Sequence, residues 1–176
     1  MIDLPGLRPS TDRIRETLFN WLGQDLVGLR CLDLFAGTGA LGFEAASRHA
    51  NSVTLLEKDK QAYAKLLANF ALLGSFPAPG EVQILHRDSL EFLKQQADRS
   101  SNLIFIDPPF QEESLLNQAL IEAARVCDDS AGGGIYVEFP ASRPREQIEA
   151  LVPHWHCGKY LEAGQVKACL FRSKRD

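Results

Sequence analysis

The chain has 176 residues, 45% of them hydrophobic, and a net charge of −4. These values fit one globular domain over residues 1–176, and no apolar run reaches the ~18 residues that cross a bilayer. The acidic balance argues against a protein that coats nucleic acid over its whole surface, but leaves room for a local basic patch. The four cysteines are scattered without a C-x-x-C pair, which predicts a cytoplasmic protein without a metal site.

Predicted strands and helices alternate along the chain. A first helix follows capping residues at 8–12, and seven strands are expected at residues 30–35, 53–57, 82–86, 103–106, 134–138, 155–161 and 166–172. Helices are expected between them at residues 40–49, 59–73, 89–96, 114–126 and 144–151. This alternation predicts an α/β fold, Rossmann-like, whose mostly parallel sheet is covered by helices on both faces. The short turn at 162–165 predicts one antiparallel strand at or near the sheet edge.

The most informative segment is the loop after the strand at 103–106. There the apolar run continues into Asp107, Pro108, Pro109 and Phe110. Two prolines restrict the loop, so a carboxylate, a free carbonyl and an aromatic ring are held together at the C-terminal end of a strand. Open α/β sheets bind their ligands at that end. The loop suits an exocyclic amine on a planar base, although it could also simply end the strand and cap the next helix.

A glycine turn follows the strand at 30–35. Residues 37–42 match G-x-G-x-x-G, with Gly37 and Gly39 placed for a tight turn and close approach of a ligand. Glu57 ends the next strand, where an acid commonly holds a ribose diol. This context favours nucleoside binding over a plain connecting turn.

Asp33, just before this turn, bears on which nucleoside is bound. Its carboxylate would repel a pyrophosphate but could help to hold an ammonium or sulfonium group, and S-adenosylmethionine (SAM) carries both. The alternative is a capping or turn residue. Asp88 and Ser89 also allow two interpretations, as an adenine-binding pair or as ordinary helix N-cap residues.

These motifs together resemble the class I SAM-dependent methyltransferases that methylate amines. Residues 7–22, which open Leu-Arg-Pro-Ser-Thr-Asp-Arg, narrow the resemblance to the bacterial 16S ribosomal RNA guanine-N2 methyltransferases of the RsmD type. Glu138 after its strand and the segment 163–166 also fit. The resemblance covers nearly the whole chain. One departure is that only six residues precede Leu7, so the basic N-terminal segment usual in the family is expected to be absent, with a cost to RNA affinity.

The resemblance implies roles for particular residues. Asp107, Pro108 and Phe110 would be catalytic, with Pro109 beside the substrate. The cofactor residues would be Asp33, Phe35, Gly37, Gly39, Glu57, Asp88, Ser89 and Thr11. Arg8, Arg13 and Arg15 form a basic cluster that is a candidate RNA contact. The expected partner is 16S ribosomal RNA, in the small subunit or an assembly intermediate, and the expected state is a monomer away from membranes.

Three alternatives remain open from the residues alone. An adenine-N6 methyltransferase could use the same loop, because the acid and carbonyl can bind either amine. An NAD-binding oxidoreductase would suit the glycine turn and Glu57, but the chain offers no second nucleotide-binding half. A non-catalytic RNA-binding assembly factor would be expected to carry a broken cofactor motif, and here both motifs are intact.

Overall fold

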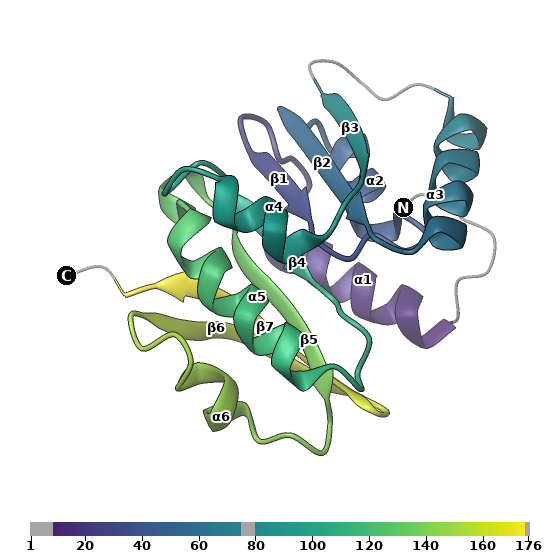
Figure 1. Cartoon of the computed structure of the whole chain (residues 1–176). Coiled ribbons are helices and arrows are strands. Elements are labelled where there is room, and N and C mark those ends of the chain that lie inside the picture. The colour runs from purple at the N-terminus through teal and green to yellow at the C-terminus, as the bar shows by residue number, and fades with distance from the viewer. Residues whose placement is uncertain (1–8, 75–79, 175–176) are drawn as a thin grey trace.

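The computed structural model describes residues 9–74 and 80–174, which form a single mixed sheet with helices on both faces (Figure 1). The elements in chain order are α1 (Pro9–Leu22), β1 (Arg30–Asp33), α2 (Ala40–Ser47), β2 (Ser52–Glu57), α3 (Lys60–Leu73), β3 (Glu81–His86), α4 (Ser89–Gln95), β4 (Leu103–Ile106), α5 (Glu113–Val126), a 3-10 turn (Asp129–Ala131), β5 (Gly134–Pro140), α6 (Arg145–Glu149), β6 (Trp155–Ala163) and β7 (Val166–Ser173). The expected α/β fold is confirmed, and each expected element is present to within a few residues. None of the helices in these two ranges is both long and apolar enough to cross a membrane.

The sheet has seven strands in the order β3-β2-β1-β4-β5-β7-β6. The five strands β1 to β5 run parallel to one another, and β7 pairs antiparallel with both β5 and β6. The single reversed strand is therefore second from the edge, as the short turn predicts. The strand order reverses direction between β1 and β4. Ligands of open α/β sheets bind at such a switch point, beyond the C-terminal ends of the strands.

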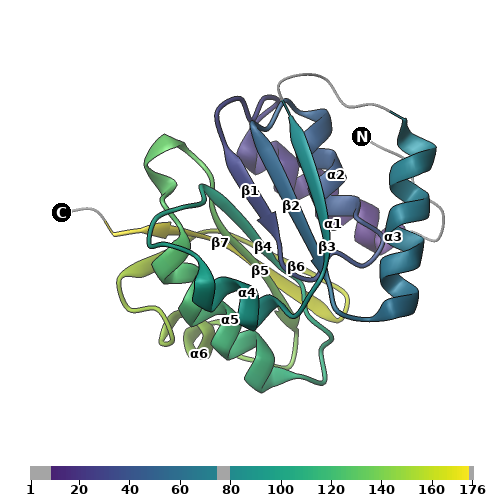
Figure 2. The same ribbon diagram turned by 45° about the horizontal axis from the view of Figure 1, so that its top comes forward.

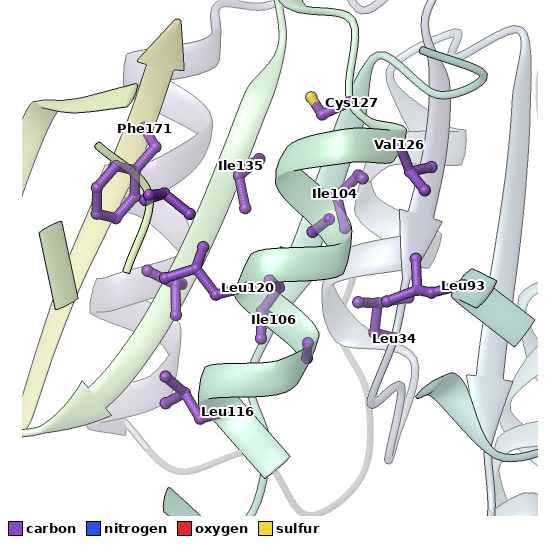
Figure 3. Packing of buried hydrophobic residues seen from close by; sticks show 14 of the residues in the cluster. Leu34, Leu93, Ile104, Ile106, Leu116, Leu120, Val126, Cys127, Ile135 and Phe171 are labelled. Carbon is purple, nitrogen blue, oxygen red and sulfur yellow. The ribbon is translucent and has the colours of Figure 1, made fainter. Parts of the chain in front are cut away.

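Two layers of helices enclose the sheet. Helices α1, α2 and α3 cover one face and α4, α5 and α6 cover the other, as Figure 2 shows from a second direction. Figure 3 shows the α5 layer, in which leucines of the helix lie against isoleucines of β4 and β5. Strand β4 is completely buried because it lies in the middle of the sheet with helices on both sides, and this confirms the prediction from its run of four apolar residues.

The glycine turn after β1 is closely packed. Gly39 has φ +86°, and a Cβ there would overlap the ring of Phe43 and lie 2.7 Å from Cδ1 of Leu66. Both neighbours are fully buried core residues. Gly164, in the turn between β6 and β7, also has positive φ (+61°), but a Cβ there would meet nothing within 4 Å.

We therefore expect Gly39→Ala to lower the free energy of unfolding by about 2–4 kcal/mol, because it combines backbone strain with overpacking. Gly164→Ala is the matched control and should cost about 1 kcal/mol from strain alone. Urea unfolding of the two variants measures both values. Equal losses at the two positions would contradict this account of the turn.

Candidate active site

Three carboxyl groups meet at the C-terminal ends of neighbouring strands. Asp33 ends β1, Asp107 directly follows β4, and Glu138 lies near the end of β5. Ile106 pairs with Val137, so Asp107 and Glu138 are the next residues along two adjacent parallel strands. Side chains alternate between the faces of a sheet, which places both acids on the face covered by α1.

The three acids line one cavity of about 760 Å³. The sides of this cavity come from the glycine turn, the end of β2, the start of α4 and the loop after β4. Among the predicted site residues, its lining includes Arg15, Asp33, Phe35, Gly37, Glu57, Asp88, Ser89, Asp107, Pro108 and Pro109. The cavity lies at the switch point between β1 and β4, where the topology of the sheet favours ligand binding.

Hydrogen bonds between backbone and carboxylates hold the glycine turn in place. The Gly37 amide donates to Oε2 of Glu57 at 3.0 Å, and the Gly42 amide donates to Oδ2 of Asp33 at 2.9 Å. The side chain of Asn69 on α3 donates to the Thr38 carbonyl at 2.9 Å. Asp33 is therefore not the N-cap of α2, which is Gly39, but it binds an amide of the first turn of that helix while it also lines the cavity.

Burial changes the ionisation of all three strand-end acids. Loss of solvent raises the pKa of Asp33 to about 7, that of Asp107 to about 6 and that of Glu138 to about 8. The nearby negative charge of Asp107 adds to the rise in pKa at both Asp33 and Glu138. Fewer than three negative charges are therefore present here at neutral pH.

Asp88 and Ser89 have structural partners as well as a place in the cavity. Oδ1 of Asp88 caps α4 by accepting from the amides of Leu90 and Glu91, and Oδ2 accepts from Nζ of Lys58 at 2.9 Å. The hydroxyl of Ser89 donates to the Leu34 carbonyl, which ties the start of α4 to β1. The N-cap interpretation is therefore correct for Asp88. Its cavity position also leaves the adenine-binding interpretation open.

Arg15 is buried, whereas Arg13, two residues earlier on α1, is exposed. Arg15 is only 3% exposed, it lines the cavity, and its guanidinium binds Asp12 at 2.9 Å. Arg15 lies on the inner side of α1 because it stands three and four residues before the buried Leu18 and Phe19, and its role as an RNA contact stays a prediction. That helical spacing could have revealed its position in advance.

Other predicted residues lie outside the cavity lining. Gly39 is buried under the turn, Phe110 is half-buried beyond the prolines, and Arg13 is exposed on α1. Arg8 and the side chain of Thr11 lie outside the described residues. Within residues 9–74 and 80–174, no group of three His, Cys, Asp or Glu side chains is placed to hold a metal ion.

Glu138 is the main cavity residue to which sequence reasoning gave no role. It comes after a run of buried residues near the end of β5, much as Asp107 comes after those of β4, and this similar position was the available signal. Lys58 and Glu112 also line the cavity. Neither belongs to a motif that would have singled it out.

The fold is shared with a solved SAM-dependent methyltransferase from Agrobacterium tumefaciens, with a TM-score of 0.65 and 21% identity over 83% of this chain and 50% of that chain. This likeness shows a shared fold, and the acidic cavity lies at the end of the sheet where folds of this kind bind their ligands.

Sequence comparison identifies the family to which the chain belongs. Residues 1–172 match the family described as Conserved hypothetical protein 95. Ribosomal RNA small subunit methyltransferase D of Escherichia coli (strain K12) is 38% identical over 97% of this chain and 81% of its own length. A solved structure from Escherichia coli, of a protein named as the methyltransferase yhhF, has a TM-score of 0.76 and 36% sequence identity to this chain. The match covers 99% of this chain and 92% of that one. The chain belongs to this family of methyltransferase D proteins.

The buried acids predict how stability changes with pH. A carboxyl group whose pKa is higher in the folded than in the unfolded state binds more protons when folded, so stability falls as pH rises between the two values. For Asp107 the fall runs from about pH 4 to about 6. We expect Asp107→Asn to raise the free energy of unfolding by about 1–2 kcal/mol at pH 8, after allowance for partial solvent access, with little change at pH 4.

Urea unfolding at the two pH values measures this difference. Glu81→Gln, at an exposed acid on the edge strand β3, is the matched control and should change stability little at either pH. A gain from Asp107→Asn that is equal at pH 4 and pH 8 would contradict the role given to burial of the charge.

Proposed function

We propose that this protein transfers the methyl group of SAM to the exocyclic N2 amine of a guanine in small-subunit ribosomal RNA. The observation that carries the proposal is that Asp107 and Pro108 line the same cavity as Asp33, Gly37 and Glu57. An amine-binding loop and a nucleoside-binding turn therefore share one chamber. The name of the 38% identical Escherichia coli relative supports ribosomal RNA of the small subunit as the substrate.

The residues of the turn fit SAM. A Cβ on Gly37 would meet nothing within 4 Å, so the backbone is open to a ligand on that side. Carboxylates dominate the charged lining, which suits the cationic ammonium and sulfonium groups of SAM and opposes the pyrophosphate of a dinucleotide. Asp33 and Gly37 would face the methionine end, Glu57 the ribose, and Asp88 with Ser89 the adenine. SAM supplies an electrophilic methyl group.

The loop after β4 would orient the acceptor amine. The nitrogen lone pair of an aromatic amine is delocalised into its ring, which makes the amine a poor nucleophile. Hydrogen bonds from the two amine hydrogens to the Asp107 carboxylate and the Pro108 carbonyl would turn the lone pair toward the methyl group. Catalysis is then largely positioning of the two reactants, and the methylated amine is acidic enough to lose its proton without a strong base. Phe110, which lies outside the cavity lining, would stack on the base. Such stacking contributes about 1–3 kcal/mol to binding.

The acceptor base must reach this cavity by leaving its stack or by being unpaired already. Arg13 is exposed on α1, the helix whose other side carries Arg15 into the cavity, so it is placed to contact the RNA backbone. We further propose that the protein acts in the cytoplasm as a monomer. Its substrate would be the small ribosomal subunit or an assembly intermediate of that subunit. Adenine N6 is the competing acceptor, because the same loop could bind that amine.

Transfer of tritiated methyl from SAM to unmodified small-subunit RNA and to assembled particles, followed by nucleoside analysis, tests the proposal. We expect N2-methylguanosine in one or both substrates. N6-methyladenosine as the product would move the proposal to the other amine, and no transfer to either substrate would reject it.

We expect Asp107→Ala to reduce turnover by at least about 100-fold while the affinity for SAM stays within about threefold, because Asp107 would bind the amine rather than the cofactor. Removing this half-buried carboxyl also relieves part of a desolvation cost, so the variant should fold. Single-turnover methyl transfer and calorimetric SAM titration measure the two effects. A variant that keeps most of its rate would remove Asp107 from the reaction.

A further inference from the structure

Glu138 occupies a place in the cavity that neither cofactor binding nor the amine-binding loop explains. The residue is only 7% exposed, yet it lines the chamber beside Asp107. Its neighbours on the same strand are completely buried apolar residues, and Val137 pairs with Ile106. No ion pair joins Glu138 to a cation in the described part of the chain. An acid kept at such a position costs folding free energy, which suggests that it serves a ligand.

Tyr136 holds the Glu138 carboxyl in one orientation. The phenol donates a hydrogen bond to Oε1 of Glu138 at 2.7 Å, and Tyr136 is fully buried under α1 with its ring 6.4 Å from that of Phe105. A ring packed this firmly fixes where Oε1 lies. Because Tyr136 uses one oxygen, Oε2 is the oxygen with which the carboxyl can bind a ligand.

The charges around Glu138 decide what kind of hydrogen bond it offers. Asp107 after the neighbouring β4 and Asp33 on β1 add negative charge, and Arg15 from α1 and Lys58 after β2 are the cations in the described lining of the same chamber. Burial and the Asp107 charge raise the pKa of Glu138 above that of Asp107, so Asp107 ionises first. At neutral pH the pair then presents an acceptor at Asp107 and a hydroxyl donor at Glu138.

This donor and acceptor match the edge of guanine. Paired strands lie about 4.8 Å apart, which is comparable to the separation between the exocyclic groups at positions 2 and 6 of a purine. Guanine has an amine at position 2 and an acceptor oxygen at position 6, whereas adenine has a donor amine at position 6. A carboxylate and a carboxylic acid on adjacent strands can bind both exocyclic groups of guanine at once.

We propose that Glu138 determines base specificity by donating a hydrogen bond from its carboxyl to O6 of the target guanine, while Tyr136 orients that carboxyl and Asp107 binds the N2 amine. This inference rests on the proposed function and deepens it. Glu138 touches the substrate, and Tyr136 is a positioning residue. The arrangement also predicts why an adenine would be rejected, since its position-6 amine would meet the Glu138 hydroxyl donor-to-donor.

The test compares two acceptor bases that both carry the N2 amine. Small-subunit RNA is assembled by ligation with either guanine or 2,6-diaminopurine at the methylated position, so that only the position-6 oxygen or amine and the N1 proton differ. The ratio of kcat/KM for the two RNAs is measured for the full-length wild-type protein, Glu138→Ala, Glu138→Gln and Tyr136→Phe. We expect wild type to prefer guanine by at least about tenfold.

Glu138→Ala should bring this ratio to within about twofold of one, because it removes the donor. Glu138→Gln should keep most of the preference, since its amide can still donate while its oxygen accepts from Tyr136. Tyr136→Phe should give an intermediate ratio. Calorimetric SAM affinity near the wild-type value shows that each variant is folded, because Glu138 does not serve the cofactor.

A Glu138→Ala variant that methylates guanine and keeps the full preference would overturn the inference and leave the proposed function intact. Equal rates of wild type on the two RNAs would do the same. If wild type methylates no guanine in any RNA, the proposed function itself fails, and this inference fails with it.

Discussion

The site depends on the cost of burying several carboxyl groups at the ends of neighbouring strands. The register of β1, β4 and β5 brings Asp33, Asp107 and Glu138 to one edge and one face of the sheet, under α1. Full ionisation of all three in this partly dry chamber would be costly, so their pKa values rise and separate. The resulting mixture of carboxylate and carboxylic acid gives the chamber both acceptors and donors for a neutral base.

The rest of the fold supports these acids without neutralising them. Backbone amides rather than cations bind Asp33 and Glu57, which keeps their positions fixed and leaves the lining predominantly acidic. Helix α1 packs its apolar side against the core on this face of the sheet and contributes the buried Arg15 to the cavity lining. The buried acids lower stability, and this is the usual cost of a preorganised site.

Much of this arrangement could be predicted because it depends on local patterns. Strand–helix alternation predicts the parallel sheet, the buried run at 103–106 predicts a central strand, and the turn near Gly164 predicts the reversed strand β7. The positions of Asp33 and Asp107 at strand ends predict that the two acids lie near one another, since the C-terminal ends of parallel strands meet at one edge of the sheet. The burial of Arg15 also follows a local pattern, since Arg15 stands three residues before the buried Leu18 on α1.

What could not be predicted comes from pairing across the sheet. The register of β4 against β5 places Glu138 beside Asp107, whereas the Tyr136–Glu138 hydrogen bond joins two residues on the same side of one strand. Pairing also separates two cations of the last strand, because Lys167 lies opposite Phe139 of β5 whereas Arg172 lies opposite His156 of β6, toward the other end of β7.

Side-chain carboxyl titration by ¹³C NMR, with signals assigned from single amide variants, tests the central claim most directly. The account predicts that Asp107 titrates near pH 6 and Glu138 near pH 8, so that one is ionised while the other still carries its proton. Titration of both groups near pH 4 would contradict it, because the chamber would then hold only carboxylates.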